Sequence, residues 1–198
     1  MSKRYLFIKR IFDIIASFLG CLLCLALIWW WVSLIDLFSS KGNPFFVQNR
    51  IGKNKRTFRI LKFRSLKNDA PKYIAPFKIT GEQQYNMETR FGHFLRKTQL
   101  DETLQLFNIL IGQMSFIGPR PGAAINEVEL IKEREKLSPL IYTLRPGLTG
   151  LAQVDLIEDR HNPALKAQKD FEYYQNMSLK LDIKIIFRTI AFLFRKKR

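Results

Sequence analysis

Two adjacent acids, Asp101 and Glu102, are the residues whose types and position best suit chemistry in this chain. They stand at the start of an apolar run that ends in a Gly-Pro-Arg-Pro sequence at 118–121. Neighbouring carboxylates repel each other, and on a helix they point about 100° apart, so they would perform different tasks. One carboxylate can attack a phosphorus atom as a nucleophile. The other can hold a divalent cation, whose ligands are carboxylate, phosphate and water oxygens.

Three arginines are candidates for binding the phosphate groups of an anionic substrate. Arg96 precedes the acids by about one helical turn, Arg120 lies between two prolines, and Arg145 also precedes a proline. Proline fixes φ and lowers the ordering cost of a binding loop, while a guanidinium matches two phosphate oxygens. The structural alternatives are weak surface ion pairs for the arginines, and for the acids a favourable helix-dipole interaction of about 0.3–1 kcal/mol each.

The elements expected to position these residues are mainly helical. Apolar residues at helical spacing predict a helix over 101–111, with Thr98 in a loose form of a capping box. A second helix is predicted over 123–137. Segments rich in aromatic and β-branched residues predict a β-hairpin. Its strands are expected over 44–50 and 57–65. A long loop is expected over 67–90, and a turn over 145–150.

A membrane segment is predicted near the N-terminus. Residues 14–35 are 22 residues without a charge, and as a helix they would span about 33 Å, enough to cross a hydrocarbon core. Basic residues flank both sides, so the positive-inside rule gives no asymmetry. The segment either crosses the bilayer or enters and leaves on one face. Because Trp29, Trp30 and Trp31 favour an interfacial depth, we expect a re-entrant helix bent between Gly20 and Ile28.

The net charge of +16 is concentrated at the two ends of the chain. Residues 1–66 contain 12 Lys or Arg and two acids, 178–198 contain seven and one, and 67–177 contain 14 of each. This distribution favours an anionic membrane surface over nucleic acid, which would place the charge on the folded body. We therefore divide the chain into a membrane anchor at 1–40, a catalytic domain at 41–177 and a basic C-terminal segment.

The C-terminal segment, 178–198, is predicted to contain an amphipathic helix over 178–194. Lys180, Lys184 and Arg188 recur every four residues among apolar side chains, which gives the helix a narrow basic stripe. Such a helix can lie in the membrane interface. The alternative is a core helix with one solvated edge.

Several motifs in order make the chain resemble the bacterial sugar transferase family, the small monotopic phosphoglycosyl transferases. The resemblance covers nearly all 198 residues. The motifs are KRIFD at 9–13, QNRIG at 48–52, FRILKFRS at 58–65, LDE at 100–102 followed by LFN at 106–108, MSFIGPRP at 114–121, and RPGLTG at 145–150 followed by AQV at 152–154. The chain departs from the family pattern at Leu25-Ala26, where many members have Ser-Pro, at Gln113, and at Asp155-Leu-Ile, where many have Asn-Gly-Arg.

The resemblance implies an α+β, mainly helical fold with a membrane-embedded helix, a small hairpin and interfacial helices around a cytoplasmic active site. It also implies transfer of a sugar 1-phosphate from a nucleoside diphosphate sugar, UDP-sugar being the expected donor, to polyprenol phosphate. Asp101 would form a covalent phosphosugar intermediate, assisted by Glu102 and Mg²⁺ held by this acid pair. Phosphate or substrate would contact Lys62, Arg64, Arg96, Arg120 and Arg145, and the nucleotide-binding loop would contain Gly118, Pro119 and Pro121.

The resemblance further places the protein in the bacterial inner membrane, with its catalytic domain on the cytoplasmic face and in contact with anionic lipids. No nucleic-acid partner is expected, and a homo-oligomer is left open. The competing interpretation is a catalytically silent membrane scaffold of a polysaccharide assembly complex. A scaffold would keep the anchor and the amphipathic helix but would not need Asp101.

Overall fold

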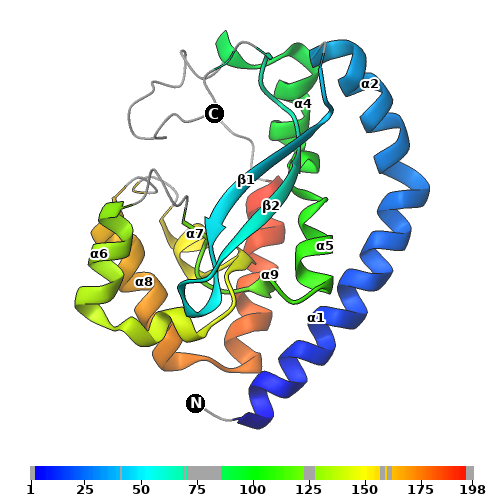
Figure 1. Ribbon diagram of the computed structural model, residues 1–198. Helices are drawn as coiled ribbons and strands as arrows, with labels where there is room; N and C mark the ends of the chain where they lie inside the picture. The colour runs from blue at the N-terminus through cyan, green and yellow to red at the C-terminus, as the bar shows by residue number, and fades with distance from the viewer. Residues whose placement is uncertain are drawn as a thin grey trace.

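The computed structural model describes residues 3–40, 42–68, 70, 86–122, 128–156, 159 and 162–194. In these parts most elements are helices, accompanied by two small two-stranded sheets (Figure 1). The mainly helical α+β class is therefore confirmed. Most of the loop expected over 67–90, the first five residues of the helix expected over 123–137, and the terminal 195–198 lie outside the described residues.

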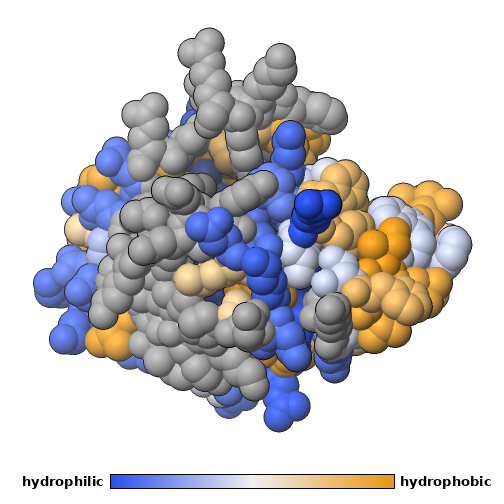
Figure 2. All heavy atoms as spheres, turned by 90° about the horizontal axis from the view of Figure 1, so that it is seen from above, coloured by the Kyte–Doolittle hydropathy of each residue, from blue (hydrophilic) through white to orange (hydrophobic). Residues whose placement is uncertain are grey.

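A long N-terminal helix runs along one side of the molecule (Figure 1). It comprises α1 (Lys3–Cys24), the π-helical turn η1 (Leu25–Trp29) and α2 (Trp30–Ser40). By length and composition, Lys3–Ser39 could cross a membrane. Apolar side chains cover the side where α2 lies (Figure 2).

The π turn overlaps the interval in which the sequence predicts a bend, and π turns are recognised sites of helix bending. Side chains satisfy carbonyl groups around it. The Trp30 indole donates to the Ala26 carbonyl at 3.2 Å, and the Trp31 indole donates to the Leu27 carbonyl at 2.6 Å. These bonds offset the cost of an irregular backbone in an apolar medium. The re-entrant path itself stays a prediction.

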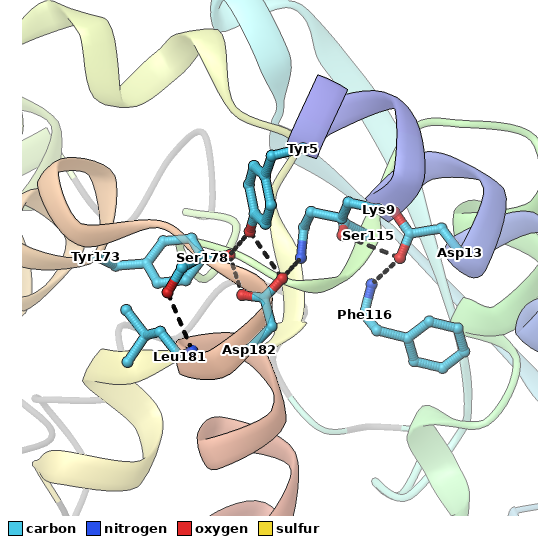
Figure 3. A network of polar contacts seen from close by, with 9 residues as sticks. All are labelled: Tyr5, Lys9, Asp13, Ser115, Phe116, Tyr173, Ser178, Leu181 and Asp182. Atoms are coloured by element: carbon cyan, nitrogen blue, oxygen red, sulfur yellow. Dashed lines mark hydrogen bonds and ion pairs between the residues drawn. The ribbon is translucent and has the colours of Figure 1, made fainter. Parts of the chain in front are cut away.

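The N-terminal part of α1 is bound to the rest of the protein by polar contacts. Asp13 is buried and accepts hydrogen bonds from the Ser115 hydroxyl at 3.1 Å and the Phe116 backbone N–H at 3.0 Å (Figure 3). Arg10 donates to the last two carbonyl groups of α5 (Gln105–Leu110), at 2.8 and 3.0 Å. A guanidinium at a helix C-terminus interacts favourably with the last carbonyl groups of the helix.

The predicted hairpin is confirmed. Strands β1 (Phe45–Ile51) and β2 (Thr57–Phe63) pair in antiparallel register, with Phe45 opposite Phe63 and Ile51 opposite Thr57. The turn between them contains two non-glycine residues in the left-handed region, Asn54 and Lys55.

A second sheet was not predicted. Strands β3 (Ser115–Ile117) and β4 (Gly147–Thr149) pair in parallel, so the segment expected as a turn over 145–150 contains a strand, and the turn prediction is wrong there. Glycine permits this close pairing. A Cβ on Gly118 would lie 2.4 Å from the Arg145 carbonyl oxygen, and one on Gly147 would lie 2.2 Å from the Gly118 nitrogen. Two motifs far apart in sequence therefore form one structural unit.

The single α-helix expected over 101–111 is divided into the 3₁₀ turn η4 (Leu100–Glu102) and α5. The capping role proposed for Thr98 is wrong, because its hydroxyl donates to carbonyls within α4 (Arg90–Thr98). Gln99 adopts a left-handed conformation, with φ of 58°, which ends α4 and starts the turn. The other elements are α6 (Val128–Leu137), η5 (Pro139–Thr143), α7 (Leu151–Asp155), α8 (Pro163–Asn176) and α9 (Leu179–Phe194).

Two apolar clusters hold the described elements together. One lies between the N-terminal helix, the hairpin, α4 and α5, and the other joins β3, α7, α8 and α9. Helix α9 confirms the helix predicted over 178–194. It packs through Ile185 and carries an exposed apolar row on its opposite side: Leu179, Ile183, Phe187 and Ile190.

Candidate active site

The acid pair lies on η4, and the residues Leu100 and Leu104 on either side of the pair pack in the first apolar cluster. Leu104, just beyond the turn, is buried in that cluster, and the Glu102 backbone N–H donates to the Gln99 carbonyl at 3.2 Å. The left-handed Gln99 and the apolar anchor together fix the turn. Asp101 is only 7% exposed, whereas the Glu102 side chain is 21% exposed.

Glu102 is held by two cations from different elements. Its Oε1 accepts from Lys62 Nζ on β2 at 2.5 Å and from Arg120 Nη2 at 3.3 Å. Burial alone would raise the pKa of Glu102, but the nearby Lys62 and Arg120 reverse this effect and lower it to about 2. Glu102 is therefore ionised at neutral pH, as a cation ligand requires.

Asp101 has the opposite shift. Burial raises its pKa to about 6; Lys62 and Arg96 oppose this rise, and the charge of Glu102 adds to it. At pH 7 most of the Asp101 side chain is a carboxylate that has lost much of its hydration. A poorly hydrated carboxylate beside cations is suited to attack an electrophilic phosphorus.

Arg96 is positioned by α4. Thr89 caps this helix, because its hydroxyl accepts from the Gly92 N–H at 2.8 Å. Gly92 allows close packing on the end of β2, since a Cβ there would lie 1.9 Å from the Ser65 carbonyl oxygen. Arg96 donates to the buried Glu88 at 2.6 Å while remaining close enough to lower the pKa of Asp101. The sequence did not reveal Glu88.

Asn108 is a positioning residue that the sequence reasoning missed. Its side chain is buried in α5 and bridges to β2: Oδ1 accepts from the Leu61 N–H at 3.1 Å and Nδ2 donates to the Arg59 carbonyl at 2.8 Å. The amide thus pairs with two backbone groups of β2, as a neighbouring strand would. It fixes the backbone next to Lys62 relative to the helix that follows the acids. The only available signal was its location in the LFN motif.

The loop at 118–121 is held by its backbone and presents Arg120. The Gly118 N–H donates to the Thr149 carbonyl at 3.0 Å, and Pro119 and Pro121 are buried, whereas the Arg120 side chain is 48% exposed. The Arg120 carbonyl accepts from Arg134 Nη2 at 2.9 Å.

Arg134 is itself 3% exposed and forms an ion pair with buried Asp170 at 2.6 Å. An ion pair between α6 and α8 thus holds the guanidinium that binds the Arg120 carbonyl of the loop. Neither residue was singled out from the sequence.

Two predicted phosphate ligands form hydrogen bonds with groups other than the acids. Arg64 donates to Asn68 at 2.9 Å. Arg145 donates through Nε to the Gly112 carbonyl at 2.9 Å, just beyond the C-terminal end of α5. The structure therefore brings together Asp101, Glu102, Lys62 and Arg120, with Arg96 nearby. His93 pairs with Glu88, while His161 lies outside the described residues.

The acid pair fits a divalent cation that also binds substrate. Within the described residues no group of three or more His, Cys, Asp or Glu side chains could form an all-protein metal cage. Both cations that hold Glu102 contact the same oxygen, Oε1, and among the described residues no hydrogen bond or ion pair involves Oε2. Mg²⁺ is commonly held by one or two carboxylates together with substrate phosphates and water.

The site thus combines a buried carboxylate and phosphate-binding cations with a long apolar helix, an arrangement suited to phosphoryl chemistry at a membrane. The sequence model of the bacterial sugar transferase family matches residues 4–196, so this chain belongs to that family. The expected resemblance is confirmed along nearly the whole chain.

Relatives indicate the range of activities in the family. The chain is 38% identical over 194 residues to UDP-N-acetylgalactosamine-undecaprenyl-phosphate N-acetylgalactosaminephosphotransferase of Aeromonas hydrophila, covering 96% of this chain and 44% of that protein. It is 37% identical over 188 residues to undecaprenyl-phosphate glucose phosphotransferase of Komagataeibacter xylinus, covering 92% and 35%. It is 36% identical over 201 residues to the exopolysaccharide production protein PSS of Rhizobium leguminosarum bv. phaseoli, covering 94% of both. The chain spans less than half of the first two relatives and most of the third.

Proposed function

We propose that this protein transfers a sugar 1-phosphate from a UDP-sugar to undecaprenyl phosphate and so starts the assembly of an exopolysaccharide or other glycoconjugate. An Asp101 oxygen attacks the β-phosphorus of the donor. The bond from that phosphorus to the bridging oxygen breaks, and its electron pair leaves with the nucleoside monophosphate. An oxygen of the lipid phosphate then attacks the phosphosugar on Asp101, which releases the carboxylate and forms a polyprenol diphosphate sugar.

The single observation that carries this proposal is the contrast between the two acids. Asp101 is buried with its pKa raised to about 6, whereas Glu102 is held ionised by Lys62 and Arg120. Opposite shifts in adjacent carboxylates separate a nucleophile from an ionic helper. The names of the relatives support the donor and acceptor classes.

The cations have binding roles in this proposal. Arg120 holds a phosphate oxygen from its proline-framed loop, and Lys62 both orients Glu102 and faces the phosphate. Mg²⁺, held by Glu102 with Asp101 nearby, would neutralise charge on the diphosphate. Gly118, Pro119 and Pro121 shape the rim of the nucleotide site.

Trapping the covalent intermediate tests the proposal. Purified protein is incubated with UDP-sugars labelled in the sugar, without lipid acceptor, and denatured. We expect label on wild-type protein and none on Asp101→Asn, because an amide does not attack phosphorus. The matched control is Asp159→Asn, which removes a carboxylate outside the acid pair and should keep the label.

Label on Asp101→Asn at the wild-type level would disprove the nucleophile assignment. Absence of both label and nucleoside monophosphate release across a panel of donors would favour the silent scaffold. A Mg²⁺ titration of wild type and Glu102→Gln then tests the metal, and we expect the variant to need a higher Mg²⁺ concentration.

We also propose that the protein lies in the bacterial inner membrane, with the catalytic part on the cytoplasmic face. The apolar N-terminal helix, its π turn and the exposed apolar row of α9 support this location. Cysteines introduced at Ser2 and Ser40, with Cys21 and Cys24 replaced, distinguish the two paths. A re-entrant helix protects both from an impermeant thiol reagent in intact cells, whereas labelling at position 2 would indicate a crossing helix.

A further inference from the structure

A cavity of about 40 Å³ lies between the N-terminal end of α1 and the rest of the protein, in a region that the proposed mechanism does not use. Its lining includes Lys9, Arg10, Lys53 and Arg145, with Asp13 as the acid among the lining residues. This volume exceeds the roughly 10–15 Å³ that one water needs, so it can hold a small polyatomic ion. The lining carries four cations and one carboxylate, and Asp182 pairs with Lys9 beside it, so the cavity keeps a net positive charge.

The contacts of these residues show which charges are already balanced. Lys9 forms an ion pair with Asp182 at 2.7 Å, and Asp182 also accepts from Tyr5 and Tyr173 (Figure 3). Asp13 is occupied by its two hydrogen bonds to β3. The acids around the cavity are therefore committed to fixed partners.

Three other cations keep donors for a ligand. Arg10 and Arg145 both bind carbonyls near the end of α5, which bring only partial negative charge. Within the described residues, no ion pair joins Arg10, Arg145 or Lys53 to a carboxylate. Lys53 is exposed at the tip of the hairpin. Like charges gathered around a cavity favour an anion, and guanidiniums match phosphate geometry.

We propose that this cavity is a second anion site that binds a phosphate group, separate from the acid pair. Its walls also include Leu6 and Met177, and α1 exposes Phe7 and Ile11 close by in sequence. An ionic centre with apolar surroundings suits the phosphate of an anionic lipid as well as free phosphate. The site would give Arg145, framed by a proline, a binding role beside α1.

Phosphate binding by the purified full chain in detergent tests this proposal. Equilibrium dialysis with labelled inorganic phosphate is carried out in an Arg120→Ala background, which weakens binding at the acid pair. We expect Arg145→Gln to raise the dissociation constant about tenfold or more, as loss of a charge-assisted contact implies. Lys53→Ala should raise it about threefold, and the matched control Lys132→Ala, on exposed α6 surface, should leave it unchanged.

Competition distinguishes the two sources of phosphate. Short-chain phosphatidylglycerol that displaces the label better than short-chain phosphatidylcholine would identify a lipid headgroup as occupant. Label lost in the variants but displaced by neither lipid would identify a site for free phosphate. Equal dissociation constants for Lys53→Ala, Arg145→Gln and Lys132→Ala would overturn the proposal. Because binding is measured without donor or turnover, this result is independent of whether Asp101 is the nucleophile.

Discussion

Lys62 places its ammonium nitrogen 2.5 Å from Oε1 of Glu102, 40 residues further along the chain. This contact joins the hairpin to the acid pair and is a main reason why the pKa of Glu102 falls to about 2 although its partial burial acts in the opposite direction. The hairpin thus has a direct electrostatic role in the site. The contribution of the Lys62 ammonium to turnover can be measured by removing it while keeping the length of the side chain.

Lys62→Met should lower kcat/KM for the sugar donor by about tenfold to a hundredfold, since a charge-assisted hydrogen bond contributes about 1.5–3 kcal/mol. The control is Lys67→Met, which removes an exposed ammonium bound to the Asn86 carbonyl at 2.8 Å. Steady-state release of nucleoside monophosphate is the measurement. Equal rates for the two variants would show that Lys62 has no part in the site.

The pH dependence of turnover should show an acidic limb with an apparent pKa near 6. Asp101 has a raised pKa of about 6, so its nucleophilic form is lost about tenfold per pH unit below that value. Glu102, with a pKa of about 2, stays ionised over the same range. Single-turnover rates between pH 4.5 and 8 provide the test. A rate independent of pH below 6 would exclude Asp101 as the titrating group.

Stability should depend on pH through the same residue. The folded pKa of Asp101 lies above the ordinary value of 3.8, so its ionisation destabilises the fold progressively between about pH 4 and 6. Asp101→Asn should therefore be more stable than wild type at pH 7, by up to about 2–3 kcal/mol, and nearly equal at pH 4. Thermal unfolding at both pH values measures this difference. If the stability of Asp101→Asn relative to wild type fell between pH 4 and pH 7, the claim that burial raises the pKa of Asp101 would be contradicted.

The hairpin and the C-terminal helix could be predicted because their patterns are local. Alternating aromatic and β-branched residues mark Phe45–Ile51 and Thr57–Phe63, and helical spacing marks Leu179–Phe194. The acid pair was expected in the first turn of a helix at the start of an apolar run, and the structure places it on the 3₁₀ turn η4 just before α5. For the hairpin and α9, the residue pattern within the segment itself identifies the element.

The parallel pairing of β3 with β4 could not be predicted, since three-residue strands have no clear period and their pairing depends on close glycine contacts. The 3₁₀ turn that replaces the start of the helix expected over 101–111 begins after one left-handed residue, Gln99, a conformation that sequence pattern does not reveal. Arg145 was grouped with the acids because of its proline frame, although tertiary structure turns it toward α1. Such long-range choices are set by packing and not by local propensity.

Asn108→Leu should lower both stability and turnover. The substitution leaves the Leu61 N–H and the Arg59 carbonyl without their buried partner, which costs about 1–3 kcal/mol for each unsatisfied group. Because β2 then loses its link to α5, Lys62 should be less well placed and kcat should fall more than KM rises. The control is Asn176→Ala, an exposed amide at the end of α8. Urea unfolding and donor kinetics measure both effects, and a loss of stability with unchanged kcat would reduce Asn108 to a structural role.

The ion pair of Arg134 with Asp170 should couple stability to the Arg120 loop. Arg134→Met leaves a buried carboxylate unpaired and should cost about 3–5 kcal/mol, whereas Arg134→Met combined with Asp170→Leu should recover much of this loss. The double variant still lacks the hydrogen bond to the Arg120 carbonyl. It should therefore fold well but bind the nucleotide sugar more weakly. A double-mutant cycle by urea unfolding, with donor KM measured for the double variant, separates the two roles: a normal KM would show that the loop is positioned without Arg134.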